Sequence, residues 1–193
     1  MKKKVFSLMM TLLLAVTGFV RADELTVHDG TATNSYIPVW GLWTDNSLQH
    51  EFVYPASELA GMNGGEISAL KFFTSSSYAN VSWNGSFQVY MKEVSETSLS
   101  SFLGTSDAAL VYQGTLGVAS QEMTVTFTTP YTYNGGNLWV AVYYTATTGY
   151  SSSYWVGESV NGNAVYGRSG NNYTVNTTSF LPKTTFTYTP GEG

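Results

Sequence analysis

The chain has 193 residues, of which 43% are hydrophobic, 15% are aromatic and none is cysteine, and its formal net charge is −5 at pH 7. This length suits a single domain with its own core. The missing cysteines exclude a disulfide framework and a cysteine nucleophile. Eight basic residues against thirteen acidic ones make nucleic acid a poor partner, because its binding requires clustered Lys and Arg.

Residues 1–22 predict a secretory signal peptide. Three lysines, Lys2 to Lys4, precede an interrupted apolar run over 5–20, and Val20-Arg21-Ala22 offers small residues at the −3 and −1 positions of a cleavage site. The run is too short and interrupted for a membrane anchor. We therefore expect cleavage before Asp23, an exported protein outside the cell or on a bacterial cell surface, and no membrane insertion after cleavage.

Residues 23–193 are expected to form one domain. Four basic and thirteen acidic residues remain in it, a formal charge of −9, and the basic ones are scattered (Lys71, Lys92, Arg168 and Lys183). An anionic membrane surface is therefore disfavoured as a partner, as nucleic acid is.

Strand patterns dominate this domain. Apolar and polar residues alternate over 87–92 and 123–128, while 138–144 is apolar on both faces, which predicts a central strand with neighbours above and below. Further strands are predicted over 67–73, 109–112, 153–156, 164–166 and 184–188. Helix is predicted only as single turns over 55–59 and 97–103.

Turn sequences separate the predicted strands. Asn and Gly recur between them, at 63–65, 84–85, 134–136 and 161–162, and these residues tolerate positive φ. Many short strands with such turns predict an all-β sandwich or barrel with at least seven strands and under about one-tenth helix.

Several segments of the chain resemble a module of Bacteroidetes-type secreted surface proteins. The resemblance is found at Thr31–Trp40 (TATNSYIPVW), Tyr54–Leu59 (YPASEL), Gly65–Phe72 (GEISALKF), Val89–Met91 (VYM), Thr97–Phe102 (TSLSSF) and Pro130–Val142 (PYTYNGGNLWVAV). It implies a jelly-roll-like antiparallel β-sandwich, often followed by fibronectin type III repeats and a sorting tail. It implies no catalytic motif, and residues 23–193 contain neither such repeats nor a sorting tail.

Catalytic and metal-binding patterns find little support in the residues. A Ser or Thr triad needs a histidine base, but His28 and His50 lie far from any Gly-x-Ser-x-Gly motif, and we interpret both as surface histidines. Asp29 and Asp45 are modest calcium ligands that fit turns better. We expect no metal, no cofactor and no catalytic residue.

A glycoside hydrolase needs two carboxylates about 5–10 Å apart across a cleft. Nothing in the sequence singles out one such pair. Glu51 and the segment 93–96 fit solvated polar positions better, together with the neighbouring His50.

Aromatic residues in turn-rich segments are the remaining candidates for a binding site. Trp and Tyr rings stack on the apolar faces of sugars when they are exposed, and close the ends of the core when they are not. The candidate ligand-binding residues are Trp40, Trp43, Tyr150, Tyr154 and Trp155, with Trp83 as a third location. Trp139, in the doubly apolar strand, is assigned to the core.

The sequence thus favours a non-catalytic binding or adhesion module that contacts an extracellular glycan or protein. A carbohydrate-binding domain that uses exposed aromatics is the main alternative, and a small extracellular glycoside hydrolase is a third.

Overall fold

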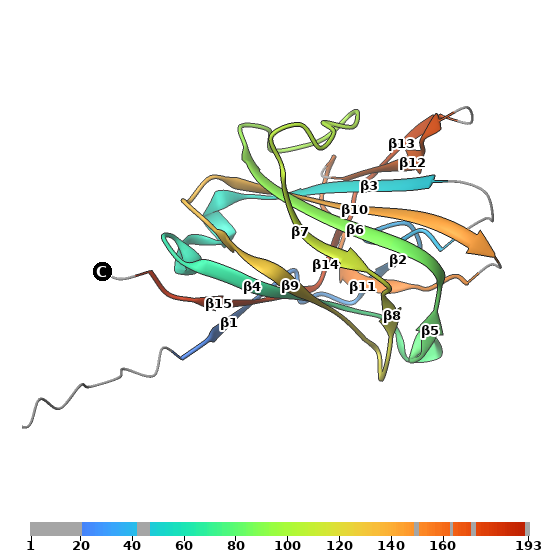
Figure 1. Ribbon diagram of the computed structural model, residues 1–193, viewed down its shortest axis with the longest axis horizontal. Helices are drawn as coiled ribbons and strands as arrows, with labels where there is room; N and C mark the ends of the chain where they lie inside the picture. Colours follow the sequence, from blue (N-terminus) through green and yellow to red (C-terminus); the bar gives the residue numbers. More distant parts are fainter. Residues whose placement is uncertain (1–20, 42–46, 149–150, 163, 171–172, 192–193) are drawn as a thin grey trace, which may run out of the picture.

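The computed structural model describes residues 21–41, 47–148, 151–162, 164–170 and 173–191. These residues form an antiparallel β-sandwich of two main sheets, together with two small sheets (Figure 1). Strands make up 56% of the structure and helices 6%, which confirms the predicted all-β fold class. Within the described ranges, no helix has the length and apolar character needed to cross a membrane.

The larger sheet has six strands in the order β13-β12-β3-β10-β6-β7. Their bounds are β3 Ser47–Tyr54, β6 Asn84–Val94, β7 Ala109–Gly114, β10 Asn137–Thr148, β12 Ala164–Arg168 and β13 Thr174–Thr178. Strand β10 lies at the centre and pairs antiparallel with both β3 and β6.

The smaller main sheet has four strands in the order β1-β15-β4-β9. Their bounds are β1 Asp23–Val27, β4 Glu66–Phe73, β9 Glu122–Thr132 and β15 Thr184–Thr189. Long strands that follow one another in the chain, such as β3 and β4 or β9 and β10, lie in different sheets, as in a jelly roll.

Short elements complete the structure. Three-stranded and two-stranded sheets have the orders β14-β11-β2 and β5-β8. Their bounds are β2 Ala32–Asn34, β5 Val81–Ser82, β8 Gly117–Val118, β11 Trp155–Glu158 and β14 Leu181–Pro182, and the 3-10 turns are η1 Ala56–Glu58, η2 Ala60–Met62 and η3 Ser76–Tyr78. The turn predicted over 55–59 is confirmed by η1.

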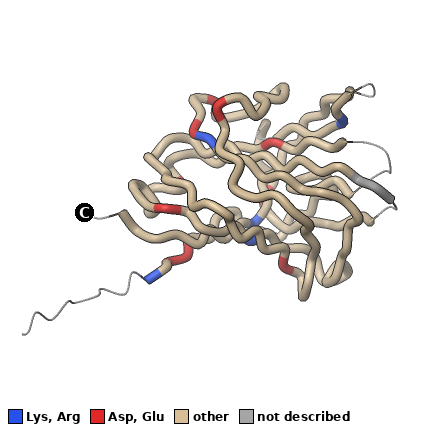
Figure 2. The backbone as a smooth tube through the Cα atoms, viewed as in Figure 1, with Lys and Arg blue, Asp and Glu red and all other residues tan. Residues whose placement is uncertain are grey.

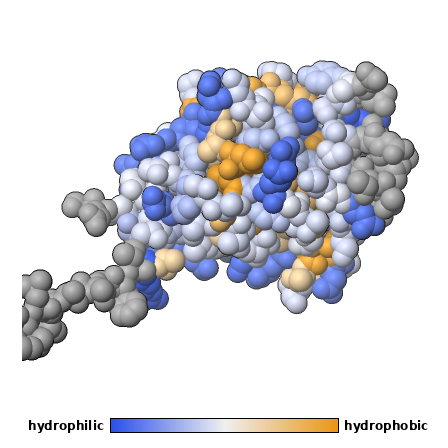
Figure 3. Space-filling view, viewed as in Figure 1, coloured by the Kyte–Doolittle hydropathy of each residue, from blue (hydrophilic) through white to orange (hydrophobic). Residues whose placement is uncertain are grey.

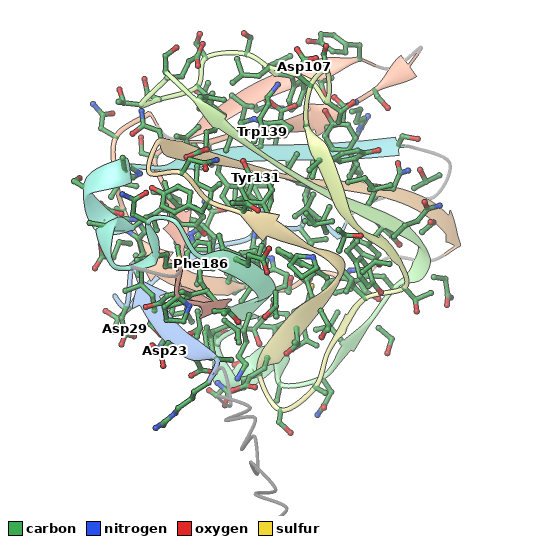
Figure 4. The ribbon with its side chains drawn as sticks, turned by 60° about the vertical axis from the view of Figure 1, so that its left-hand side comes forward. Asp23, Asp29, Asp107, Tyr131, Trp139 and Phe186 are labelled. Carbon is green, nitrogen blue, oxygen red and sulfur yellow. The ribbon has the colours of Figure 1, made fainter. Side chains whose placement is uncertain are left out.

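Alternation along β10 divides its side chains between two apolar clusters. Leu138, Val140 and Val142 belong to the main core between the sheets. Trp139 and Ala141 point the other way and belong to a second cluster on the outer face of the six-stranded sheet. The buried position predicted for Trp139 is confirmed, since none of the residue is exposed, and it lies on the opposite side of the sheet from Phe186 (Figure 4).

The second cluster is covered by the segment 95–108, which connects β6 to β7 and is called here the β6–β7 loop. Leu99, Phe102 and Leu103 of this loop pack against the cluster. The helical turn predicted over 97–103 is wrong, because the segment instead spreads its apolar side chains over the sheet and has no helix. A loop therefore covers part of the face where the sequence predicted a neighbouring layer.

The sequence interpretation also missed β3 and misplaced one turn. Strand β3 is central although it contains His50 and Glu51, both fully buried, so the interpretation of these residues as surface or solvated is wrong. Gly85, expected in a turn, lies inside β6, where a Cβ would collide with the Thr145 carbonyl oxygen. This glycine allows two strands to approach closely.

The charges of the domain are sparse and mostly acidic (Figure 2). Lys71 forms an ion pair with Glu122, and Lys183 forms one with Asp29. The visible surface is largely polar, with a small apolar patch over β7 (Figure 3), where Leu110 is 43% exposed.

Candidate functional site

The structure brings the two predicted aromatic segments side by side. Gly41 accepts a hydrogen bond from the Ser151 amide at 3.1 Å, and the Trp155 Nε1–H donates to the Val39 carbonyl at 2.8 Å. The segment 39–41 therefore runs against 151–155. Trp43 and Tyr150 lie outside the described residues.

Trp155 does not present its ring to solvent. It is fully buried, as is Ser153, whereas Tyr154 between them is 44% exposed. An extended chain directs successive side chains to opposite sides, so Trp155 points into the core and Tyr154 points out. The expectation that Trp155 forms an exposed ligand platform is therefore wrong.

Trp83 also belongs to the core. It is 6% exposed, its ring stacks on Trp155 with centroids 6.1 Å apart, and its Nε1–H donates to the Ser151 carbonyl at 2.8 Å. Both rings belong to the main core, and the third candidate location is excluded as an exposed platform.

Trp40 lies in a half-buried aromatic cluster with Tyr36 and Tyr166. Its ring meets both tyrosines edge-on, at centroid distances of 5.8 and 5.3 Å, while the tyrosines stack on each other at 4.3 Å. The Arg168 guanidinium lies 5.8 Å from the Trp40 ring centre. Burial, and next the neighbouring Tyr36, raises the pKa of Tyr166 to about 12. Protein groups already surround much of the Trp40 ring.

His50 fixes the backbone at this cluster. Its Nε2 accepts a hydrogen bond from the Trp40 amide at 2.9 Å, and its Nδ1 lies 2.7 Å from the Val142 carbonyl oxygen. A carbonyl can only accept, so Nδ1 carries the proton and the ring is neutral. Burial lowers the pKa of His50 to about 4, although the bond to Val142 opposes this shift.

Tyr154 pairs with Tyr78 at the surface. The two ring centroids are 5.2 Å apart and the planes are tilted by 44°, and Tyr78 is half-buried. We call these two residues the tyrosine pair. Tyr154 is the one predicted site residue that the structure describes as exposed, and sequence reasoning missed Tyr78, which follows a run of four Ser and Thr residues, 74–77.

Backbone hydrogen bonds hold the tyrosine pair in place from three segments. The Ser75 amide donates to the Tyr154 carbonyl, and the Tyr78 amide donates to the Ser75 carbonyl, both at 2.9 Å. The Thr74 hydroxyl donates to the Tyr78 carbonyl at 2.8 Å, and the Gln121 amide donates to the Ala79 carbonyl at 2.8 Å. The rings therefore stand on a supported backbone.

An open pocket of about 420 Å³ lies beside the β6–β7 loop. Its lining residues are Lys92, Glu93, Val94, Ser95, Glu96, Leu103, Ser106 and Asp107. The Lys92 ammonium donates to the carbonyls of Gly104 and Ser106 at 2.9 and 3.0 Å. Glu93 accepts hydrogen bonds from the amides of Asn134 and Gly136. Lys92 and Glu93 thus hold neighbouring loops.

Glu51 holds the β6–β7 loop against the outer face of the six-stranded sheet. Its carboxylate accepts hydrogen bonds from the amides of Leu103 and Gly104, from the Trp139 indole and from the Tyr143 hydroxyl, at 2.7, 3.1, 3.0 and 2.8 Å. Burial, with the adjacent Glu51, raises the pKa of Tyr143 above its usual range. Four donors explain how a carboxylate is accommodated at a fully buried position.

His28 lies between two glutamates, so its interpretation as a surface residue is also wrong. The residue is 8% exposed; its Nε2 lies 2.7 Å from Glu58 Oε2 and its Nδ1 lies 3.1 Å from Glu158 Oε2. The Glu58 contact has the length of an ion pair but not the angle of a hydrogen bond. Of the predicted calcium ligands, Asp29 is paired with Lys183 and Asp45 lies outside the described residues.

Within the ranges that the structure covers, no group of three or more His, Asp or Glu side chains has the spacing needed to hold a metal ion. In comparisons with known proteins, the chain matches no protein-family model and no curated protein.

Proposed function

We propose that this protein is a non-catalytic binding module that acts outside the cell or on a bacterial cell surface. The observation that carries the proposal is the tyrosine pair, in which an exposed ring, Tyr154, stands on a backbone fixed by hydrogen bonds. A preorganised aromatic surface loses little conformational entropy when a ligand binds. The resemblance to secreted surface modules points the same way.

The roles of the buried ionisable groups also support binding over catalysis. His50 holds the segment that carries Trp40, and Glu51 holds the β6–β7 loop. His50 and Glu51 are thus engaged in maintaining the fold and are not free to act as a general acid or base.

Export remains part of the proposal. Strand β1 begins at Asp23, the residue that would follow the predicted cleavage site. Under this proposal the folded domain starts where the leader ends, and the exported protein retains every strand that the structure describes.

A solid-phase assay tests the proposed function. The exported protein is applied to wells coated with mucin, fibronectin, collagen or neutral polysaccharides, and the bound protein and any released reducing ends are measured over a day. We expect saturable retention on at least one coating, without product release. Retention on none of the coatings would contradict a binding role, and reducing ends that accumulate with time would support the hydrolase instead.

A further inference from the structure

We propose that the tyrosine pair, Tyr78 and Tyr154, is a stacking platform for an uncharged saccharide. This inference rests on the proposed binding function and adds to it the contact residues and the chemical class of the ligand. Its basis is the geometry of the two rings and the chemistry of the residues around them.

The two rings present flat apolar surfaces beside each other. Tyr154 is 44% exposed, and the tilt of 44° between the planes, with 5.2 Å between centroids, sets the rings at an angle. A pyranose has an apolar face of C–H groups that packs on such a ring, while its hydroxyl groups stay at the edge. Two tilted rings can contact neighbouring sugars of one twisted chain.

The surroundings of the pair are polar but uncharged. Exposed residues of the supporting segments are Ser76, Ser77, Asn80 and Ser120. Asn80 accepts a hydrogen bond from the Ser120 amide at 3.3 Å, which links two of these segments. Hydroxyl and amide groups can both donate to and accept from sugar hydroxyls, as the rim of a saccharide site requires.

The charges of the domain argue against an anionic glycan. Lys71 is paired with Glu122 at 3.3 Å. The Lys92 ammonium is bonded to loop carbonyls, Lys183 is paired with Asp29, and Arg168 lies over Trp40. A sulfated or uronic-acid polymer would thus meet an acidic protein whose basic groups are already engaged.

Native affinity electrophoresis of the exported protein tests the proposal. The gels contain xyloglucan, galactomannan, arabinoxylan or mixed-linkage β-glucan as neutral probes, and polygalacturonate or heparin as anionic ones. We expect retardation by at least one neutral probe and by neither anionic probe. Because stacking involves no net charge, the affinity in solution should change less than twofold between 0.05 and 0.5 M NaCl, on the basis of Debye screening.

Matched variants separate stacking from general effects. Tyr154→Leu keeps apolar bulk without a flat ring and Tyr78→Ala removes the second ring, so each should weaken binding by about tenfold or more, within the range for stacking contacts. Tyr154→Phe should bind like the parent. Tyr173→Ala is the control, because Tyr173 is also exposed, at 60%, but packs near Phe102 of the β6–β7 loop. Circular dichroism and melting temperature confirm that each variant is folded.

Four results would overturn the inference. It fails if no neutral probe retards the protein, if Tyr154→Leu binds like the parent, or if Tyr173→Ala loses as much affinity as the variants of the pair. Retardation only by anionic probes, abolished by salt, would also reject it. If the protein binds a matrix protein in the solid-phase assay but no polysaccharide, the proposed function stands and this inference alone fails.

Discussion

Two buried polar side chains stand next to each other on β3 and face opposite sides of the six-stranded sheet. His50 points to the inner side, where it joins the Trp40 backbone to β10. Glu51 points to the outer side, where it holds the β6–β7 loop. Strand alternation thus lets one dipeptide hold segments on both faces of the sheet.

His50 makes the stability of the protein depend on pH. The folded pKa is about 4, below the ordinary value of 6.5, because the ring is buried. The unfolded chain therefore takes up a proton more readily than the folded one as the pH decreases through 6.5. Neutral His50 therefore contributes about 3 kcal/mol to the free energy of unfolding. This contribution is fully present above pH 6.5 and is lost as the pH falls from 6.5 to 4.

Urea unfolding at pH 7.5, 6.0, 5.0 and 4.5 should therefore show a free energy of unfolding that decreases over this window. His50→Gln is the matched control, since an amide can donate to Val142 and accept from Trp40 without titrating. We expect the variant to lose this part of the pH dependence. Identical pH profiles for the parent and His50→Gln would show that His50 does not cause it.

At the scale of elements, one buried carboxylate holds the β6–β7 loop against the sheet. Glu51→Ala leaves four donors without their acceptor, among them the amides of Leu103 and Gly104. We expect a loss of roughly 3–5 kcal/mol of stability, because each buried donor left unpaired costs about 1–3 kcal/mol and the structure relaxes in part. Hydrogen exchange should also become faster over 99–108.

Glu96→Ala is the control on the same loop, because Glu96 is exposed and, among the described residues, its carboxylate accepts only from the Ser95 hydroxyl. Its effect should stay within about 0.5 kcal/mol. Equal exchange rates in Glu51→Ala and the parent would contradict the role assigned to Glu51.

The strands that sequence predicted best are those with regular alternation, such as β6, β9 and β15. Strand β3 escaped prediction because His50 and Glu51 break its apolar pattern, and their burial is compensated only by partners distant in sequence. The helical turn over 97–103 failed for a similar reason, since Glu51 binds the amides at its end. In both segments, hydrogen bonds to residues distant in sequence determine the local structure.

The candidate site was predictable only in part. The composition of 150–155 indicated surface aromatics, and Tyr154 fits this expectation. Composition does not reveal, however, which residues of an extended segment face the core and which face solvent. The same argument therefore wrongly placed Trp155 at the surface. Tyr78 could not be found from sequence, because its contact with Tyr154 joins η3 to the start of β11.

At the scale of the whole molecule, acidic charge is in excess. Lys71 and Lys183 form ion pairs with Glu122 and Asp29, but residues 23–193 retain a formal charge of −9. Repulsion among the remaining carboxylates opposes the compact state and is screened by salt.

We therefore expect the melting temperature to rise between 10 and 300 mM NaCl. About 1 kcal/mol of relieved repulsion corresponds to roughly 2–4 °C for a chain of this size. Differential scanning calorimetry measures the shift, with sucrose of equal osmolality as the control for solute exclusion. A decrease in melting temperature would show that the ion pairs outweigh the repulsion.

The order of the four-stranded sheet, β1-β15-β4-β9, has a consequence for the timing of folding. The last strand, β15, lies between β1 and β4 and pairs with both. A nascent chain without residues 184–189 cannot join its first strand to the rest of this sheet. This sheet therefore cannot be completed before residues 184–189 have been synthesised, since contacts between distant segments form late. Under the proposal of export, a chain that folds late stays unfolded long enough to pass through a translocation channel.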